Sequence, residues 1–107
     1  MTDSPLAKPL KLPCGAVLPN RIAKAAMTEG LADDNLHATH RHETLYRRWS
    51  EGGAGLLITG NVMIDHRVLE RPGNVAIDPA PAEGEPDAMA PLRAWAEAGT
   101  RNGNHLW

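Results

Sequence analysis

The sequence predicts an α/β fold in which helices cover a parallel sheet. Residues 55–60 form a short apolar run between two glycines, which is the pattern of a strand buried on both of its faces. A helical pattern over residues 40–51 comes directly before this strand, and a second one over about residues 88–101 follows it. Strands that alternate with helices form βα units, so the predicted sheet is parallel.

The N-terminal region predicts a hairpin followed by a first strand of that sheet. Residues 10–12 and 16–18 alternate apolar with other residues on either side of a Pro-Cys-Gly turn, which indicates two short paired strands. Residues 21–26 are compact and partly β-branched, and they predict the next strand. It runs into residues 27–30, where a glycine permits a sharp change of direction.

Local signals set the expected ends of the two helices. Thr39 is the predicted N-cap of the first helix, and Gly52-Gly53 supply its stop. Asp87 is the predicted cap of the second helix. Its apolar-to-small stripe recurs at spacings of three and four and consists of Met89, Leu92, Trp95, Ala96 and Gly99.

The remaining segments predict a long loop and the start of a third strand. Residues 61–87 are expected to be irregular, and their end, residues 78–87, is too rich in proline, glycine and acidic residues for regular structure. Residues 105–107 predict a strand that begins as the chain ends. The element order is hairpin, strand, helix, strand, helix and the start of a strand.

The composition argues against several classes of partner. The 107-residue chain has a net charge of -2 and its basic residues are scattered except for Arg47-Arg48, so no nucleic-acid surface is expected. Its single cysteine, Cys14, cannot form an intrachain disulfide, which favours a reducing compartment and a cytoplasmic location. No signal-peptide pattern and no run of about 18 apolar residues is present, so we expect a soluble protein without a membrane partner.

Five short segments carry a combined pattern in their order and separations. They are residues 18–22, 25–28, 46–49, 51–60 and 103–104. Together they resemble the opening of Old Yellow Enzyme-type NADH:flavin oxidoreductases, from about residue 8 to residue 107. The resemblance implies a partial TIM (β/α)8 barrel, made of the N-terminal hairpin, the first two βα units and the start of the third strand. Residues 1–107 would then be the N-terminal fragment of an FMN-binding barrel domain, which takes about 250 residues when complete.

The resemblance also implies a cofactor and its contacts. FMN would take hydride from NAD(P)H and pass it to a small-molecule substrate, an activated alkene or a similar acceptor. The backbone at Ala26 and Met27 would contact the flavin, and the Thr28 hydroxyl would bond its O4/N5 edge. Gly60 and Asn61 would approach its pyrimidine side. The family's usual proline is replaced by Ala26, which leaves the backbone contact possible.

Other flavin- and substrate-binding segments of the family have no counterpart in these residues. The resemblance therefore implies no catalytic residue in this chain, and we expect the isolated 107-residue chain to be inactive. The alternative hypothesis is a non-catalytic truncated fragment that folds poorly or self-associates through an open sheet edge.

The polar residues outside these segments have simpler interpretations. Taken alone, Thr28 would only satisfy the backbone of a turn. A zinc module is a weaker alternative, because a structural site usually needs four ligands and the only cysteine is distant, so solvated histidines are favoured at His37, His40 and His42. Three carboxylates near the expected site have no evident partner and are expected to be exposed: Glu29, Asp33 and Asp34. The Gly-Gly-Ala-Gly segment at residues 52–55 is expected to stop a helix, since a nucleotide-binding glycine loop follows a strand and opens a helix.

Overall fold

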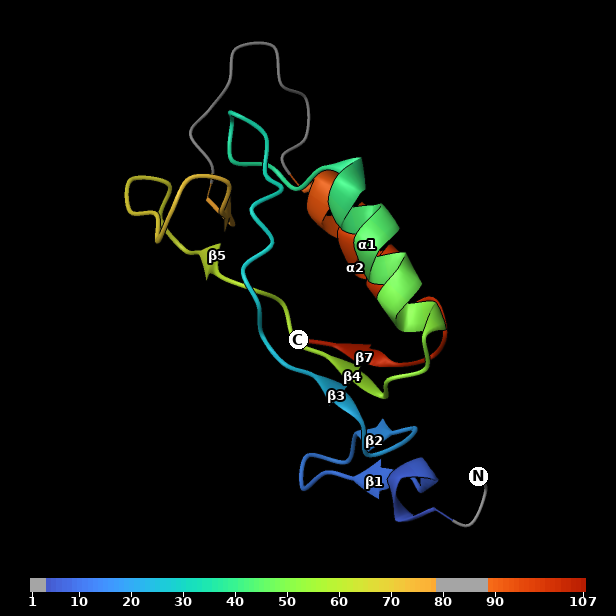
Figure 1. The fold of residues 1–107 in the computed structure, drawn as a ribbon. Coiled ribbons are helices and arrows are strands. Elements are labelled where there is room, and N and C mark those ends of the chain that lie inside the picture. The colour runs from blue at the N-terminus through green and yellow to red at the C-terminus, as the bar shows by residue number, and fades with distance from the viewer. Residues whose placement is uncertain (1–3, 79–88) are drawn as a thin grey trace.

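The computed structural model describes residues 4–78 and 89–107. Figure 1 shows a hairpin at one end of the molecule, a small sheet in the middle, and two helices packed side by side. In chain order the elements are the 3-10 helix η1 (Pro5–Ala7), β1 (Leu10–Lys11), β2 (Val17–Leu18), β3 (Ala23–Lys24), α1 (His40–Glu51), β4 (Leu56–Leu57), β5 (Val62–Met63), β6 (Val75–Ala76), α2 (Ala90–Gly99) and β7 (His105–Leu106).

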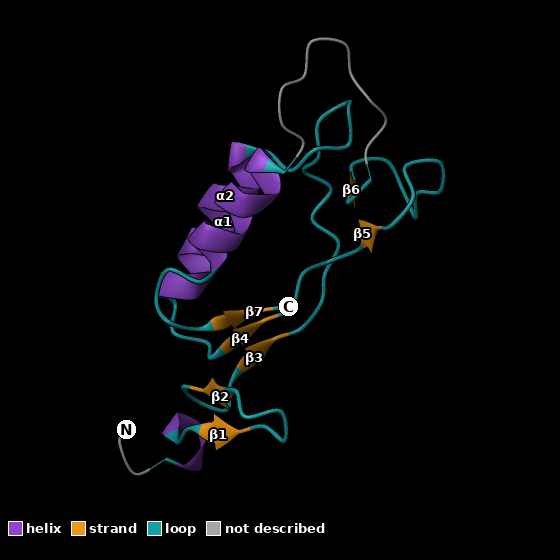
Figure 2. Ribbon diagram, turned by 180° about the vertical axis from the view of Figure 1, so that it is seen from behind, coloured by secondary structure: helices purple, strands orange, loops and turns teal. Residues whose placement is uncertain are grey.

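The central sheet is parallel, with strand order β3-β4-β7. Leu56 pairs with Ala23 on one side and with His105 on the other. The ladder continues past β4, where the Ile58 N–H donates to the Lys24 carbonyl at 3.1 Å. Figure 2 shows the three strands side by side below the two helices. The predicted alternation of parallel strands and helices is therefore confirmed.

The helix α1 begins and ends at the predicted residues. The Thr39 hydroxyl accepts from the Arg41 N–H at 3.3 Å, and the Thr39 N–H donates to Nδ1 of His42 at 3.0 Å. These bonds satisfy backbone groups that a helix start leaves unpaired. At the other end, the Gly52 N–H donates to the Arg48 carbonyl at 2.9 Å.

The helix α2 differs in part from its prediction. It begins at Ala90, and Met89 occupies the N-cap position without a side-chain hydrogen bond. The predicted cap, Asp87, lies outside the described residues. Met89 and Ala96 are exposed, so only Leu92, Trp95 and Gly99 of the predicted stripe face inward. Helix α2 packs against α1. Its inward-facing side contains fewer residues than the apolar stripe predicted from the sequence.

The core lies between the helices and the sheet. Its buried members are Ala38, Tyr46, Leu57, Val75 and Trp95. The rings of Tyr46 and Trp95 meet edge to face, with their centroids 5.3 Å apart. This geometry is favourable for aromatic pairs and joins the two helices above β4.

Two asparagine side chains tie together segments that are distant in sequence. Asn20 Oδ1 accepts from the Gly55 N–H at 2.8 Å, which joins the start of β3 to the start of β4. Buried Asn104 accepts a hydrogen bond from Ser50 on α1 and donates to the Gly99 carbonyl of α2 at 2.7 Å. Both asparagines thus fix the strands relative to their neighbours.

The hairpin is confirmed, whereas the segment after β4 is more regular than predicted. The strands β1 and β2 pair antiparallel, with Leu10 opposite Leu18. Residues 61–78 were expected to be irregular, but they contain the parallel pair β5 and β6, with Val62 opposite Val75. Two-residue strands carry no readable periodicity, and this pairing depends on contacts such as Ala76 N–H to the Leu36 carbonyl at 3.0 Å. The rest of the predicted loop, residues 79–87, lies outside the described residues.

We expect Leu57→Ala to lower the free energy of unfolding by about 2–5 kcal/mol, because it leaves a cavity in the core. Leu57 is 1% exposed and packs within the core, whereas Leu6 is 56% exposed. The matched control Leu6→Ala should therefore change stability by less than about 0.5 kcal/mol. Urea unfolding followed by tryptophan fluorescence measures both values, and equal losses would contradict this account of the core.

Candidate flavin site

The loops that follow β3 and β4 lie side by side at the carboxyl edge of the central sheet. The Thr28 hydroxyl oxygen accepts a hydrogen bond from Nδ2 of Asn61 at 3.1 Å. A Cβ atom added at Gly60 would lie 2.2 Å from the Met27 carbonyl oxygen, so the two backbones approach closely. The structure therefore brings together four of the five residues predicted to bind the cofactor, and Ala26 directly precedes them in the same loop.

This pair of loops presents an accessible edge. Ala26, Met27 and Asn61 are exposed, Thr28 is half-buried and Gly60 is buried. The small side chain of Ala26 leaves the backbone there accessible to a planar group, whereas the space beside the Gly60 Cα is occupied by the Met27 carbonyl. The edge also lies at the carboxyl ends of parallel strands, where α/β folds place their ligands.

The hydrogen bond from Asn61 determines what the Thr28 hydroxyl can do. Because the Thr28 oxygen accepts from Asn61, its own hydrogen remains free to donate to another group. Thr28 is therefore set up as a donor at the exposed edge.

Glu29 has partners that the sequence did not reveal. Its carboxylate accepts hydrogen bonds from the Tyr46 hydroxyl and from the Gly60 N–H, the latter at 3.1 Å. The prediction that Glu29 is exposed was wrong, since it is half-buried, whereas Asp33 and Asp34 are exposed as predicted. The partners lie 17 and 31 residues away along the chain, and no local pattern points to them.

Three titratable groups near Glu29 have shifted pKa values. Burial raises the pKa of Tyr46 above its ordinary value of 10.0, and the Glu29 carboxylate raises it further, so the phenol remains a donor at neutral pH. Burial lowers the pKa of Lys24, an effect that the charge of Glu29 opposes. The Lys24 ammonium lies 4.6 Å from the ring centroid of Trp49. Burial also lowers the pKa of His42, again against the attraction of Glu29.

The three clustered histidines have different environments. His40 is exposed, but His37 and His42 are buried, so the prediction of solvated histidines was wrong for two of them. His42 packs against Trp95, with ring centroids 4.6 Å apart, and caps α1. Within residues 4–78 and 89–107, no three His, Cys, Asp or Glu side chains are placed to hold a metal ion.

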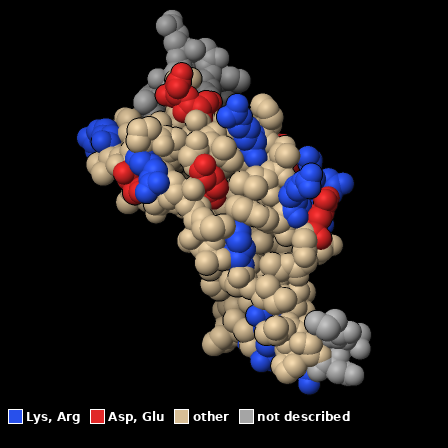
Figure 3. Space-filling model, in the orientation of Figure 1, with Lys and Arg blue, Asp and Glu red and all other residues tan. Residues whose placement is uncertain are grey.

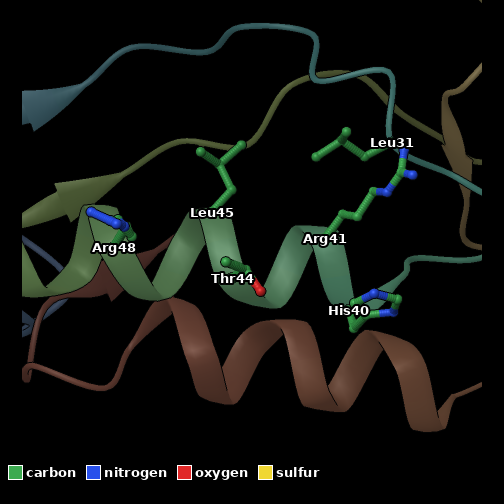
Figure 4. Close-up of a pocket in the computed structure, with 6 residues that line it drawn as sticks. All are labelled: Leu31, His40, Arg41, Thr44, Leu45 and Arg48. Carbon is green, nitrogen blue, oxygen red and sulfur yellow. The ribbon is translucent and has the colours of Figure 1, made fainter.

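A separate pocket lies along α1, away from the paired loops. It encloses about 550 Å³ and is lined by Leu31, His40, Arg41, Thr44, Leu45 and Arg48. Figure 4 shows Leu45 and Arg41 projecting from the helix towards Leu31 in the loop. None of the predicted flavin-contacting residues lines this pocket.

On the face seen in Figure 3 the charged side chains are scattered and of both signs. Of the helices in the described part of the chain, none has the length and apolar character needed to cross a membrane.

Curated proteins of known name match most of the sequence. The chain is 35% identical over 103 residues to the NADH-dependent flavin oxidoreductase iliE of Neonectria sp., which covers 96% of this chain and 13% of that protein. It is 38% identical over 105 residues to the NADH-dependent flavin oxidoreductase nadA of Aspergillus parasiticus, covering 89% of this chain and 24% of that protein. The chain thus spans a quarter or less of the length of the curated relatives it matches. No family model matches the sequence.

Solved structures show the same fold. An Old Yellow Enzyme homologue from Zymomonas mobilis matches with a TM-score of 0.77 and 20% identity, over 97% of this chain and 27% of that one. Old Yellow Enzyme from Pichia sp. matches with a TM-score of 0.78 and 22% identity, over 98% and 25%. The chain is thus similar over most of its length to NADH-dependent flavin oxidoreductases, and it shares its fold with Old Yellow Enzymes. The resemblance predicted from the five sequence segments is confirmed, and so is the α/β fold.

We expect Gly60→Ala to destabilise the chain by about 1–3 kcal/mol, because the new methyl group overlaps the Met27 carbonyl and one loop must move. Gly52→Ala is the control, since Gly52 has right-handed helical φ and ψ of -68° and -15° that suit alanine. Its nearest neighbour would be 3.2 Å away, at the Trp49 carbonyl. Thermal unfolding compares the two variants, and a smaller loss for Gly60→Ala would contradict the close approach.

Proposed function

We propose that the chain forms the N-terminal part of an FMN-binding (β/α)8 barrel in an NAD(P)H-dependent oxidoreductase. The single observation that carries this proposal is the meeting of residues 27–28 with residues 60–61 at the carboxyl edge of the sheet. The names of the relatives support the redox class. When bound, FMN would supply hydride transfer from NAD(P)H to an activated alkene or similar acceptor.

The five residues of the paired loops would hold the flavin ring. The backbone at Ala26 and Met27 would lie along the ring, and Gly60 and Asn61 would approach its pyrimidine side. The Thr28 hydroxyl would donate to an acceptor atom at the O4/N5 edge, since Asn61 already occupies its oxygen as a donor. A donor placed there in advance stabilises negative charge as it develops on a bound group.

We propose a small-molecule substrate and a cytoplasmic location, and we assign no catalytic residue to residues 1–107. The isolated chain is proposed to bind the ring without turning over NAD(P)H, because hydride transfer also requires a site that holds the nicotinamide against the flavin, and we assign no such site to residues 1–107.

An NMR titration of the 107-residue chain with FMN tests the proposal directly. We expect saturable shifts at the amides of residues 26–28 and 60–61, with riboflavin giving the same pattern because the ring makes these contacts. Thr28→Ala should weaken binding by about twofold to tenfold, the effect of one lost hydrogen bond. The control Thr100→Ala, at the exposed end of α2, should leave it unchanged. A folded chain whose shifts lie elsewhere, or are absent, would falsify the proposal.

A second candidate is a non-catalytic chain that self-associates, and the sheet itself favours it. In the strand order β3-β4-β7 each outer strand has one neighbour within the described residues. Large apolar side chains are exposed close to these edges, at Ile22, Met27 and Trp107. Unpaired strand edges next to apolar surface promote pairing with another chain.

If the sheet edge mediates association, size-exclusion chromatography with light scattering should show a mass that rises with concentration. Ala23→Lys places a charge on the exposed edge strand β3 and should shift the equilibrium towards monomer. The control Ala96→Lys adds the same charge on the exposed side of α2 and should have little effect. A monomeric mass at every concentration would rule out this candidate.

A further inference from the structure

We infer that Glu29 is a positioning residue that fixes the spacing between the two loops of the proposed flavin site. This inference rests on the function proposed above. It does not follow from the resemblance, because the five segments that carry the resemblance do not include residue 29.

The carboxylate of Glu29 joins three elements at one point. It belongs to the loop after β3, accepts from the Tyr46 hydroxyl of α1, and accepts from the Gly60 N–H at the end of β4. Tyr46 is fully buried and its ring packs against Trp49 and Trp95. The helix therefore gives the carboxylate a rigid anchor, and the carboxylate transmits that position to both loops.

The bond to Gly60 lies next to the bond that orients Thr28. Glu29 follows Thr28, and Gly60 precedes Asn61, so two consecutive side chains of one loop bond two consecutive residues of the other. The Glu29–Gly60 bond is half-buried and the Thr28–Asn61 bond is exposed. Hydrogen bonds away from water are electrostatically stronger, so the Glu29 bond has the larger effect on the loop spacing.

The chemistry of this position calls for a carboxylate. Both partners of Glu29 donate to the same oxygen, Oε2, so a glutamine could accept from both with its one carbonyl oxygen, and what the carboxylate adds is its negative charge. Bonds to a charged acceptor are also stronger than neutral ones. The charge of Glu29 also acts on Lys24 and His42, where it raises both pKa values against the effect of burial.

The first test compares Glu29→Gln with wild type in the absence of flavin. We expect amide hydrogen exchange at Gly60 to accelerate roughly tenfold, the effect of replacing a charged acceptor with a neutral one. We also expect Tyr46, the only tyrosine of the chain, to ionise at lower pH in an absorbance titration, because the negative charge that opposes the phenolate is gone. The control Glu97→Gln removes a charge from an exposed position on α2 and should change neither result.

A second variant keeps the inference testable if Glu29→Gln does not fold. Tyr46→Phe removes only the hydroxyl and leaves the ring in the core, so Glu29 loses its anchor and Gly60 exchange should again accelerate. If both variants fold and the exchange rate at the Gly60 amide is unchanged in both, the inference is overturned. If Glu29→Gln does not fold, an unchanged rate in Tyr46→Phe overturns it.

Flavin binding separates this inference from the proposed function. With FMN, Glu29→Gln should weaken the shifts at Met27 and Asn61 severalfold while Glu97→Gln matches wild type. If wild type itself shows no such shifts, the proposed function fails, whereas Gly60 exchange and Tyr46 ionisation still decide the role of Glu29. Full-strength shifts in Glu29→Gln would show that Glu29 does not position the loops.

Discussion

The central strand β4 is the element from which the other parts of the molecule take their positions. Both outer strands pair with it in parallel register, and Leu57 belongs to the same core cluster as Tyr46 of α1 and Trp95 of α2. A strand buried on both faces cannot shift by one residue without exchanging its two sets of side chains. Because β4 is held in this way, the loop that follows it has a defined starting point, and that loop forms half of the proposed flavin site.

The glycines at the two ends of this strand link the fold to the site. A Cβ atom at Gly55 would lie 2.6 Å from the Asn20 carbonyl, and one at Gly60 would lie 2.2 Å from the Met27 carbonyl. The chain of β3 thus approaches the chain of β4 closely before the paired strands and again after them. In the sequence these glycines only mark the limits of an apolar run. In the structure they allow residues 27–29 to reach residues 60–61, so a constraint of backbone packing creates the edge at which we propose the flavin binds.

Elements with local signals could be predicted from the sequence, and features that depend on distant partners could not. The cap at Thr39 and the glycines after α1 act within a few residues, so the bounds of that helix were correct. The burial of His37 and His42 and the pairing of β5 with β6 result from contacts across the fold, which no short window contains. Cofactor contacts at residues 26–28 and 60–61 came from the resemblance, and they stay predictions, although the structure brings residues 27–28 and 60–61 together.

The carboxylate of Glu29, which no local sequence pattern pointed to, explains how one short loop can both hold its position and offer a group to a ligand. A residue that binds a ligand needs a free hydrogen-bonding group at the surface, whereas a residue that holds the loop needs all of its partners inside the protein. Thr28 fulfils the first condition, because its oxygen is occupied by Asn61 and its hydrogen is free. Glu29 fulfils the second, because its partners are a buried helix residue and a buried backbone N–H. A loop with Thr28 alone would depend on an exposed hydrogen bond, which competes with water. The neighbouring half-buried carboxylate of Glu29 reduces that dependence, because it ties the same loop to α1 and to the Gly60 N–H.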